Sequence, residues 1–365
     1  MILRMIGMTT GPRTALLGTS LAAALVLAAC GGGAADDRAS AAAVPPAAAR
    51  STAPAESAAS AESEPAEAET AAPALSVVAA FYPLQFLAEK VGGDRAEVTG
   101  LTPPGAEAHD LELSPQQLAG LTESDLVVAL GDFQPSVDEA LTGLEAPVLD
   151  LAVIADRQIG EDAEPHDDHA GEGGTENEHS EDEGAQSEDE HGDSDPHFWT
   201  DPTHMAEAAE LIADAMTEAD PDGADTYAAN TETLVAELTA LDEEAQSAFT
   251  SCQVDTLVTA HDAFGYFGDR YGFEIRSING ITPDQEPDAR ALAEISDFVA
   301  DNDIRTVYTE TLVSAAIAET VAAEAGVDTL VLDPVEGLTD DSAGADYLEV
   351  MRANIDAVRA GQVCT

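Results

Sequence analysis

The sequence predicts an α/β protein of two lobes, each built on a parallel-type sheet flanked by helices, with one long helix joining the lobes. Three observations lead to this prediction. Short apolar runs alternate with helical periodicity between residues 75 and 153, a long helical segment follows at 224–249, and the alternation resumes after Cys252. Strands that alternate with helices form parallel sheets, and a chain of 365 residues is long enough for two such lobes.

Residues 1–29 are expected to be a signal peptide for export. Arg4 and Arg13 precede an apolar run that is short for a bilayer span. The run ends in the letters LAAC, which resemble the lipobox of bacterial lipoproteins, so Cys30 is the expected site of lipidation. The alternative is a cleaved secretory signal with an incidental cysteine.

Residues 30–74 are rich in Ala, Pro and Glu and show no apolar periodicity. Such a composition cannot bury enough apolar surface to fold, and we expect a disordered stalk. Lipidated at Cys30, the chain would be anchored through this stalk to the outer face of the cytoplasmic membrane.

The N-terminal lobe is expected to span residues 75–221. Its predicted strands are LSVVAAF, AEVTGL, DLVVAL and PVLDLAV, and its predicted helices are PLQFLAEKVG, SPQQLAGLTES and DPTHMAEAAELIADAM. Ser114 and Gln117 fit a capping box with Pro115 at the first helical position, which marks where the second of these helices begins.

The segment ADTYAANTETLVAELTALDEEAQSAF is predicted to be the linking helix, within residues 222–250. The C-terminal lobe is expected at 251–365. Its predicted strands are VDTLVTA, FEIRSI, IRTVYT and DTLVLD, and its predicted helices are AFGYFGDRYG, EPDARALAEISDFVADN, SAAIAETVAAEAG and ADYLEVMRANIDAVRA.

The charge balance excludes nucleic-acid binding. The chain has 72 acidic and 13 basic side chains, a formal net charge of -59, which repels DNA, RNA and anionic lipid. Such acidity keeps a protein soluble in salt, and it also concentrates cations near the surface. An exported chain lives in an oxidising compartment, so we expect Cys252 and Cys364 to form a disulfide rather than to remain two buried thiols.

Three histidines lie where a ligand site is expected. In open α/β sheets ligands bind beyond the carboxyl ends of the strands, and in a two-lobed protein this places the site in the cleft between the lobes. His109 follows the strand AEVTGL, His197 precedes a helix, and His261 directly follows VDTLVTA. Three imidazoles and one oxygen make a tetrahedral zinc site, and Asp333, after the strand DTLVL, is a candidate for the oxygen ligand.

Each of these residues also has a structural interpretation. A single histidine is more often a surface or core residue with a satisfied hydrogen bond, and Asp-Pro after a strand is an ordinary turn start. The recurrence of histidine at equivalent positions in both halves favours a ligand set. His204, inside a predicted helix, is interpreted as structural.

Five motifs in order carry a resemblance to a known family: PPGAEAHDLELSPQQL, DPHFWTDP, TAHDAFGYFGDRYG, INGITPDQEPDA and VLDPVEGL. From about Leu75 to the C-terminus the chain resembles the zinc-binding solute receptors of bacterial ABC importers, a family of metal receptors with a rigid linking helix. The resemblance implies a receptor without enzymatic activity, whose transported ligand is Zn²⁺. It would deliver zinc to a membrane permease driven by a cytoplasmic ATPase, and we expect a monomer.

The resemblance also implies roles for individual residues. It makes His109, His197 and His261 metal ligands, with Asp333 at or near the metal. Manganese-binding relatives have a carboxylate at the position of His261, and imidazole suits Zn²⁺ better than Mn²⁺. Some zinc receptors place Glu directly before the first ligand histidine, whereas this chain has Ala there, so the fourth ligand is open among Asp333, water and Glu107.

An acidic loop is predicted at 161–195, with sixteen acidic side chains and no Lys or Arg. Its composition cannot form a core, and we expect a mobile loop at the mouth of the cleft. Zinc receptors that the chain resembles commonly carry such an insertion. Its histidines, His166, His169, His179 and His191, would form accessory metal sites that raise the local zinc concentration, or the loop is a solvated spacer.

Other functions would use similar residues. A receptor for manganese or another divalent metal, or a metal-dependent adhesin, would use the same fold, and Co, Ni or Cd would also fit three imidazoles. A secreted zinc hydrolase would use three protein ligands and a water. The chain lacks an H-E-x-x-H pair, and Asp110 and Asp262 are better explained as residues that orient the neighbouring imidazoles or cap the elements that follow.

Overall fold

The computed structural model describes residues 74–155, 194–283 and 287–365. The expected signal peptide, Cys30, nearly all of the stalk and the four histidines of the acidic loop lie outside these ranges. Within the described ranges, no helix combines the length and the apolar character needed to cross a membrane.

Two four-stranded parallel sheets form the two lobes, as the alternation of strands and helices predicts. The first contains β1 (Leu75–Ala79), β2 (Ala96–Gly100), β3 (Leu126–Ala129) and β4 (Val148–Asp150) in the order β2-β1-β3-β4. The second contains β5 (Thr256–Thr259), β6 (Glu274–Ser277), β7 (Thr306–Thr309) and β8 (Asp328–Val331) in the order β6-β5-β7-β8. The two sheets therefore repeat one topology, although the sequence shows no short repeat.

Burial separates the central strands from the edge strands. All residues of β3, β5 and β7 are buried, which explains why these strands contain only aliphatic residues, Tyr and Thr. The edge strands β2 and β6 alternate between exposed and half-buried residues. The buried central strands thus fix the positions at which the loops at their carboxyl ends begin.

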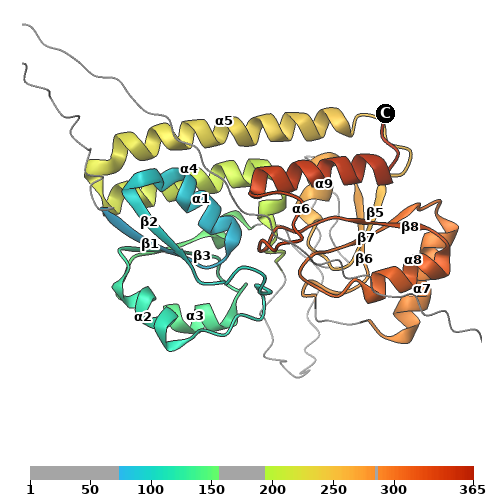
Figure 1. The fold of residues 1–365 in the computed structure, drawn as a ribbon, viewed down its shortest axis with the longest axis horizontal. Helices are drawn as coiled ribbons and strands as arrows, with labels where there is room; N and C mark the ends of the chain where they lie inside the picture. Colours follow the sequence, from blue (N-terminus) through green and yellow to red (C-terminus); the bar gives the residue numbers. More distant parts are fainter. Residues whose placement is uncertain (1–73, 156–193, 284–286) are drawn as a thin grey trace, which may run out of the picture. The chain divides into compact units, whose positions relative to one another are not determined.

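The helices cover the sheets and connect them (Figure 1). In the first half they are α1 (Tyr82–Gly92), α2 (Pro115–Glu123), α3 (Pro135–Leu141) and α4 (Pro202–Ala219), and in the second half α6 (Gly265–Tyr271), α7 (Ala289–Asp301), α8 (Ala316–Ala325) and α9 (Tyr347–Gly361). Ser114 and Gln117 form the predicted capping box at the start of α2.

Helix α5 (Ala224–Ala248) is the predicted long helix and contacts elements of both halves. It packs against α1 and α4 near its start and against α9 further on, as Figure 1 shows for the yellow helix. Leu234, Leu238 and Leu241 are buried at helical spacing. Asp242, also buried, accepts hydrogen bonds from the Arg270 guanidinium of α6 at 2.9 and 2.5 Å, which fixes α5 to the second sheet's helices.

Two local predictions differ from the structure. The strand expected over 147–153 ends at Asp150, because the carboxylate of Asp150 accepts the backbone N–H groups of Ala152 and Gly131, both at 2.9 Å, and a 3₁₀ turn follows at Leu151–Ile154. Helix α3 had no predicted counterpart. It is short and begins with Pro135 at its first turn.

A disulfide joins Cys252 and Cys364, as predicted for an exported chain. Backbone hydrogen bonds from Thr365 to Ser251 and from Gln253 to Gln362 flank it. The last residues of the chain are therefore fixed to the segment that enters β5.

Candidate metal centre

His109 lies in the loop between β2 and α2, and the loop is fixed by its own side chains. The Glu107 carboxylate accepts the backbone N–H groups of His109 and Asp110, each at 3.0 Å. The Gln134 amide donates to the carbonyl of Ala108 at 2.8 Å. The Phe133 ring packs edge-on against the imidazole at 4.5 Å between centroids. These contacts orient the ring of His109 within the loop.

His197 lies just before a 3₁₀ turn, Phe198–Thr200, that leads into α4. Its ring Nδ1 is 2.8 Å from Oδ1 of Asp195, and its backbone N–H donates to the same oxygen at 3.0 Å. Both side chains are wholly buried. A carboxylate on Nδ1 keeps that nitrogen protonated and leaves Nε2 as the metal-binding atom.

His261 follows β5 and is fixed by Glu310, the first residue after β7. Because β5 and β7 are adjacent parallel strands, their carboxyl ends bring these two residues together. Nδ1 of His261 is 2.8 Å from both carboxylate oxygens of Glu310, and its backbone N–H donates to Oε1 at 3.0 Å. The Nε2 atom is again the one left for a metal.

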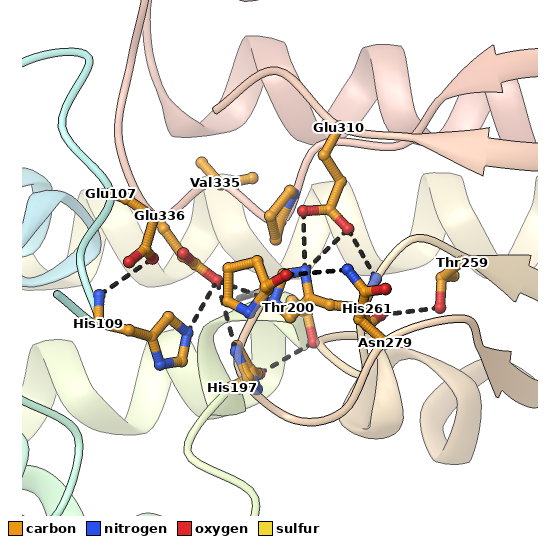
Figure 2. A network of polar contacts seen from close by, with 12 residues as sticks. Glu107, His109, His197, Thr200, Thr259, His261, Asn279, Glu310, Val335 and Glu336 are labelled. Atoms are coloured by element: carbon orange, nitrogen blue, oxygen red, sulfur yellow. Dashed lines mark hydrogen bonds and ion pairs between the residues drawn. The ribbon is translucent and has the colours of Figure 1, made fainter. Parts of the chain in front are cut away.

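The three Nε2 atoms converge on one carboxylate oxygen. Oε1 of Glu336 lies 3.5 Å from Nε2 of His109, 3.4 Å from that of His197 and 3.3 Å from that of His261. Figure 2 shows the rings turned toward this oxygen from different segments of the chain. The four side chains are at most 7% exposed. They form the one group within the described residues whose ligand atoms all lie within 4.8 Å of one another.

The distances fit a tetrahedral zinc ion. Zinc bonds to nitrogen and oxygen of about 2.0–2.1 Å give a tetrahedron whose edges are about 3.3–3.4 Å. The three Nε2 to Oε1 distances are close to that edge length. The same four atoms are buried without a good hydrogen bond in the protein, which is unusual for polar atoms and is what a bound cation explains.

Together, neighbouring charges shift the pKa values of the buried group more strongly than burial does. Burial alone would raise the pKa of Glu336, but the three imidazoles beside it hold that pKa well below its usual range. Burial alone would lower the pKa of His261, but Glu310 and Glu336 raise it to about 10. In the same way Asp195 and Glu336 outweigh burial and raise the pKa of His197. The raised pKa values favour protonated His197 and His261 beside these buried carboxylates when no metal is bound.

The structure brings together three of the four predicted ligands. Asp333 is buried but outside the group, because Oδ2 accepts from the Thr311 hydroxyl and Oδ1 from the backbone N–H of Val335, both at 2.8 Å. Both carboxylate oxygens of Glu107 accept backbone N–H groups, and Glu107 is also outside the group. His204 is paired with Asp201 at 3.1 Å and lies outside the group, in agreement with its structural interpretation.

Three functional candidates were not identified from the sequence. Glu336 stands in the quoted motif VLDPVEGL, three residues after Asp333, so the motif itself was the available signal. Asp195 was assigned to the acidic loop, where composition alone does not distinguish it from the other acidic residues. Glu310 follows a predicted strand just as His261 does, and adjacency of the two strands was the missing fact.

A family model and curated relatives match this chain. The model described as zinc-uptake complex component A, periplasmic, matches residues 77–361. The zinc-binding protein AdcA of Streptococcus pyogenes serotype M3 is 33% identical over 296 residues, which are 78% of this chain and 55% of AdcA. The high-affinity zinc uptake system protein ZnuA of Bacillus subtilis is 28% identical over 291 residues, covering 78% of this chain and 86% of ZnuA. The chain spans about half the length of the AdcA relatives.

Solved structures agree in fold. The Zn(II)-bound ZnuA-like domain of Streptococcus pneumoniae AdcA has a TM-score of 0.62 and 28% identity, covering 79% of this chain and 98% of that domain. The laminin-binding protein Lmb of Streptococcus agalactiae, described as bifunctional with adhesin and metal-transporting activity, has a TM-score of 0.64 and 28% identity, covering 79% and 99%. With a family model over most of its length and a matching two-lobed fold, the chain belongs to the ZnuA family.

Proposed function

We propose that this protein is an extracytoplasmic receptor that binds Zn²⁺ between its two lobes and delivers it to an ABC-type permease. The observation that supports this most directly is the convergence of three imidazole Nε2 atoms on one carboxylate oxygen, at distances close to the edge length of a zinc tetrahedron. The zinc ion is the cargo of this site.

The ligand set favours zinc over harder metals. Three imidazole nitrogens and one carboxylate oxygen suit Zn²⁺, whereas Mn²⁺ prefers more oxygen ligands and a higher coordination number. The carboxylates of Asp195 and Glu310 further raise the basicity of two imidazoles, which strengthens their bonds to zinc. The Zn(II)-bound state of the related AdcA domain is consistent with this choice.

The same geometry argues against the hydrolase alternative. A catalytic zinc site keeps an open position for water or substrate beside three protein ligands. Here Oε1 of Glu336 would take that fourth position, so the proposed tetrahedron is filled by protein atoms. A site closed in this way is suited to binding and release.

Delivery and anchoring are further parts of the proposal. The family model describes a component of a zinc-uptake complex, which supports a permease as partner. Streptococcus pneumoniae AdcA, a relative 33% identical over 292 residues, is described as a zinc-binding lipoprotein, which supports lipidation at Cys30. A Cys30→Ala variant should then move from the membrane fraction to the soluble fraction and lose palmitate labelling, and retention in the membrane would contradict the anchor.

Zinc content and competitive zinc titration of the purified protein test the binding function. We expect one tightly bound zinc, lost in His261→Ala and retained in His204→Ala. His204 is the matched control, because it is also a histidine paired with an aspartate but lies outside the group. Equal losses in both variants, or no tight site in the parent, would refute the function.

Deletion of residues 161–193 tests the acidic loop separately. The deletion stops there so that the segment containing Asp195 stays intact. If the loop is accessory, the tight site survives and zinc uptake falls only when zinc is limiting. Loss of the tight zinc site itself would indicate that the receptor site lies in the loop.

A further inference from the structure

The single tryptophan of the chain connects two metal ligands that are far apart in the sequence. Trp199 comes two residues after His197 and is wholly buried. Its indole Nε1–H donates to the backbone carbonyl of Pro334 at 2.7 Å, two residues before Glu336. One side chain therefore joins the segment of His197 to the loop that carries the fourth ligand.

The loop around Glu336 depends on such contacts for its shape. Val335 has a positive φ of 61°, a conformation that β-branched residues rarely adopt. At the start of the loop, Asn354 of α9 donates to the carbonyl of Asp333 at 2.7 Å and accepts its N–H at 2.9 Å. At the end, the Gly105 N–H donates to the carbonyl of Leu338 at 3.0 Å. The Trp199 bond acts between these two points, next to the strained residue.

Trp199 is itself held on several sides. Its ring packs against those of Phe81, Phe133 and His197 at 4.8, 5.3 and 5.1 Å between centroids. Its backbone carbonyl accepts the Tyr347 hydroxyl, from the first residue of α9, at 2.7 Å. A displacement of the indole would therefore disturb this packing and the carbonyl to which it donates.

We propose that Trp199 is a positioning residue for zinc: its indole N–H holds the Pro334–Glu336 segment so that Oε1 of Glu336 completes the tetrahedron. The inference rests on the proposed zinc-binding function. Metal bonds tolerate errors of only about 0.2 Å, so a small movement of this loop withdraws the fourth ligand. Replacement by Phe keeps a ring in the core but leaves the Pro334 carbonyl buried without its donor.

The test compares Trp199→Phe with the parent, using Zn²⁺ in competition with a chelator and Co²⁺ as a spectroscopic probe. We expect a loss of zinc affinity of about 10- to 100-fold, as for other residues that orient metal ligands. The visible absorption of bound Co²⁺ should also change, because the oxygen ligand is displaced while the imidazoles remain. Leu234→Ala is the control: it truncates a buried side chain of α5 that is outside the metal group and outside the ring contacts of Trp199, and it should lower the melting temperature without changing the Co²⁺ spectrum.

A double-variant cycle with Glu336→Gln separates positioning from general destabilisation. If Trp199 acts through Glu336, Trp199→Phe causes little further loss of affinity in the Glu336→Gln background. Additive losses, or an unchanged Co²⁺ spectrum in Trp199→Phe, would overturn the inference while leaving the zinc-binding function of the parent intact. A parent without a tight site would instead refute the function.

Tyr347→Phe provides a second test that keeps the tryptophan, in case Trp199→Phe does not fold. It removes only the hydroxyl that donates to the Trp199 carbonyl. We expect a loss of zinc affinity of about 2- to 10-fold, the effect of one buried hydrogen bond, and this loss should also vanish in the Glu336→Gln background. Full zinc affinity in Tyr347→Phe, or a loss that persists when Tyr347→Phe is combined with Glu336→Gln, would contradict the positioning of Glu336 by Trp199.

Discussion

The two sheets share one strand order but place their histidines differently. In the second sheet, His261 follows β5 closely and Glu310 follows the adjacent strand β7, so strand pairing itself sets the contact between ring and carboxylate. In the first sheet, β2 ends at Gly100 and His109 comes only after a loop. The loop is fixed by hydrogen bonds to its backbone and by packing of Phe133 on the imidazole.

The difference indicates a division between a rigid half of the site and an adaptable half. A ligand attached to paired central strands moves only if the sheet deforms, whereas a loop ligand depends on several weaker contacts. We therefore expect zinc affinity to be more sensitive to substitutions around His261 than to substitutions around His109.

The largest effect is expected for Glu336→Gln, which removes the carboxylate on which both halves converge. Residues that only orient metal ligands are worth about 10- to 100-fold in metal affinity, so loss of a charged ligand itself should lower zinc affinity by at least about a hundredfold. Competitive titration with a chelator measures this. A loss below about tenfold would mean that the imidazoles alone define the site, whichever sheet they belong to.

Glu310→Gln and Glu107→Gln form a matched pair that compares the two halves directly. Glu310→Gln removes the negative charge beside Nδ1 of His261 and should lower zinc affinity by about 10- to 100-fold. Gln at position 107 can still accept one backbone N–H, so Glu107→Gln should lower it by about 2- to 10-fold. If the order of the two losses is reversed in titrations, the loop is the more rigid half.

The pH dependence of zinc affinity reports on the rigid half. Zinc binds neutral imidazole, and the raised pKa of His261, about 10, means that zinc must displace a proton at neutral pH. Zinc affinity should therefore increase by at least about tenfold per unit from pH 6 to 8. Glu310→Gln should lower the pKa and move the end of this increase to lower pH. Affinity that is flat with pH in both proteins would contradict the charge state assigned to His261.

The same pKa affects the stability of the metal-free protein, with the opposite sign. A histidine whose pKa is higher in the folded state stabilises the fold below its ordinary value of 6.5, and this contribution is lost as pH rises through about 10. Relative to Glu310→Gln, the melting temperature of the metal-free protein should therefore decrease as the pH rises from 6.5 to about 10.

The smallest effect is expected for Ser114→Ala, at the end of the His109 loop. This variant removes the capping box of α2 and should destabilise the protein by about 1 kcal/mol in thermal or urea unfolding. Zinc affinity should change by less than about threefold, because the bonds from Glu107 and Gln134 remain. A larger change would show that the start of α2 positions His109.

The sequence predicted the architecture well because burial leaves a strong pattern. The continuous apolar runs of β3 and β5 and the capping box of α2 are local signals, and the structure has each of them. Helix α3 was not predicted, although Pro135 in its first turn was an available start signal. The strand at 147–153 was overextended because the capping role of Asp150 depends on Gly131, which is distant in sequence.

In the site, the three histidines were the predictable residues, because imidazole is a common zinc ligand and each histidine stands near a predicted strand or helix. His109, His197 and His261 were identified from their positions beside strands and a helix. That rule pointed to Asp333 and not to Glu336, because the sequence does not reveal the positive φ of Val335, which redirects the chain after β8. The carboxylates of Asp195 and Glu310 act through contacts that only the folded chain makes.

The position of the only tryptophan has a practical consequence. Because the indole of Trp199 lies 5.1 Å from the ring of His197, we expect its emission to change when zinc binds at the proposed site. Tryptophan emission from the unmodified protein then comes from one fluorophore beside the cargo. Loading and unloading could be timed optically in a stopped-flow instrument, with no dye attached and no radioactive zinc.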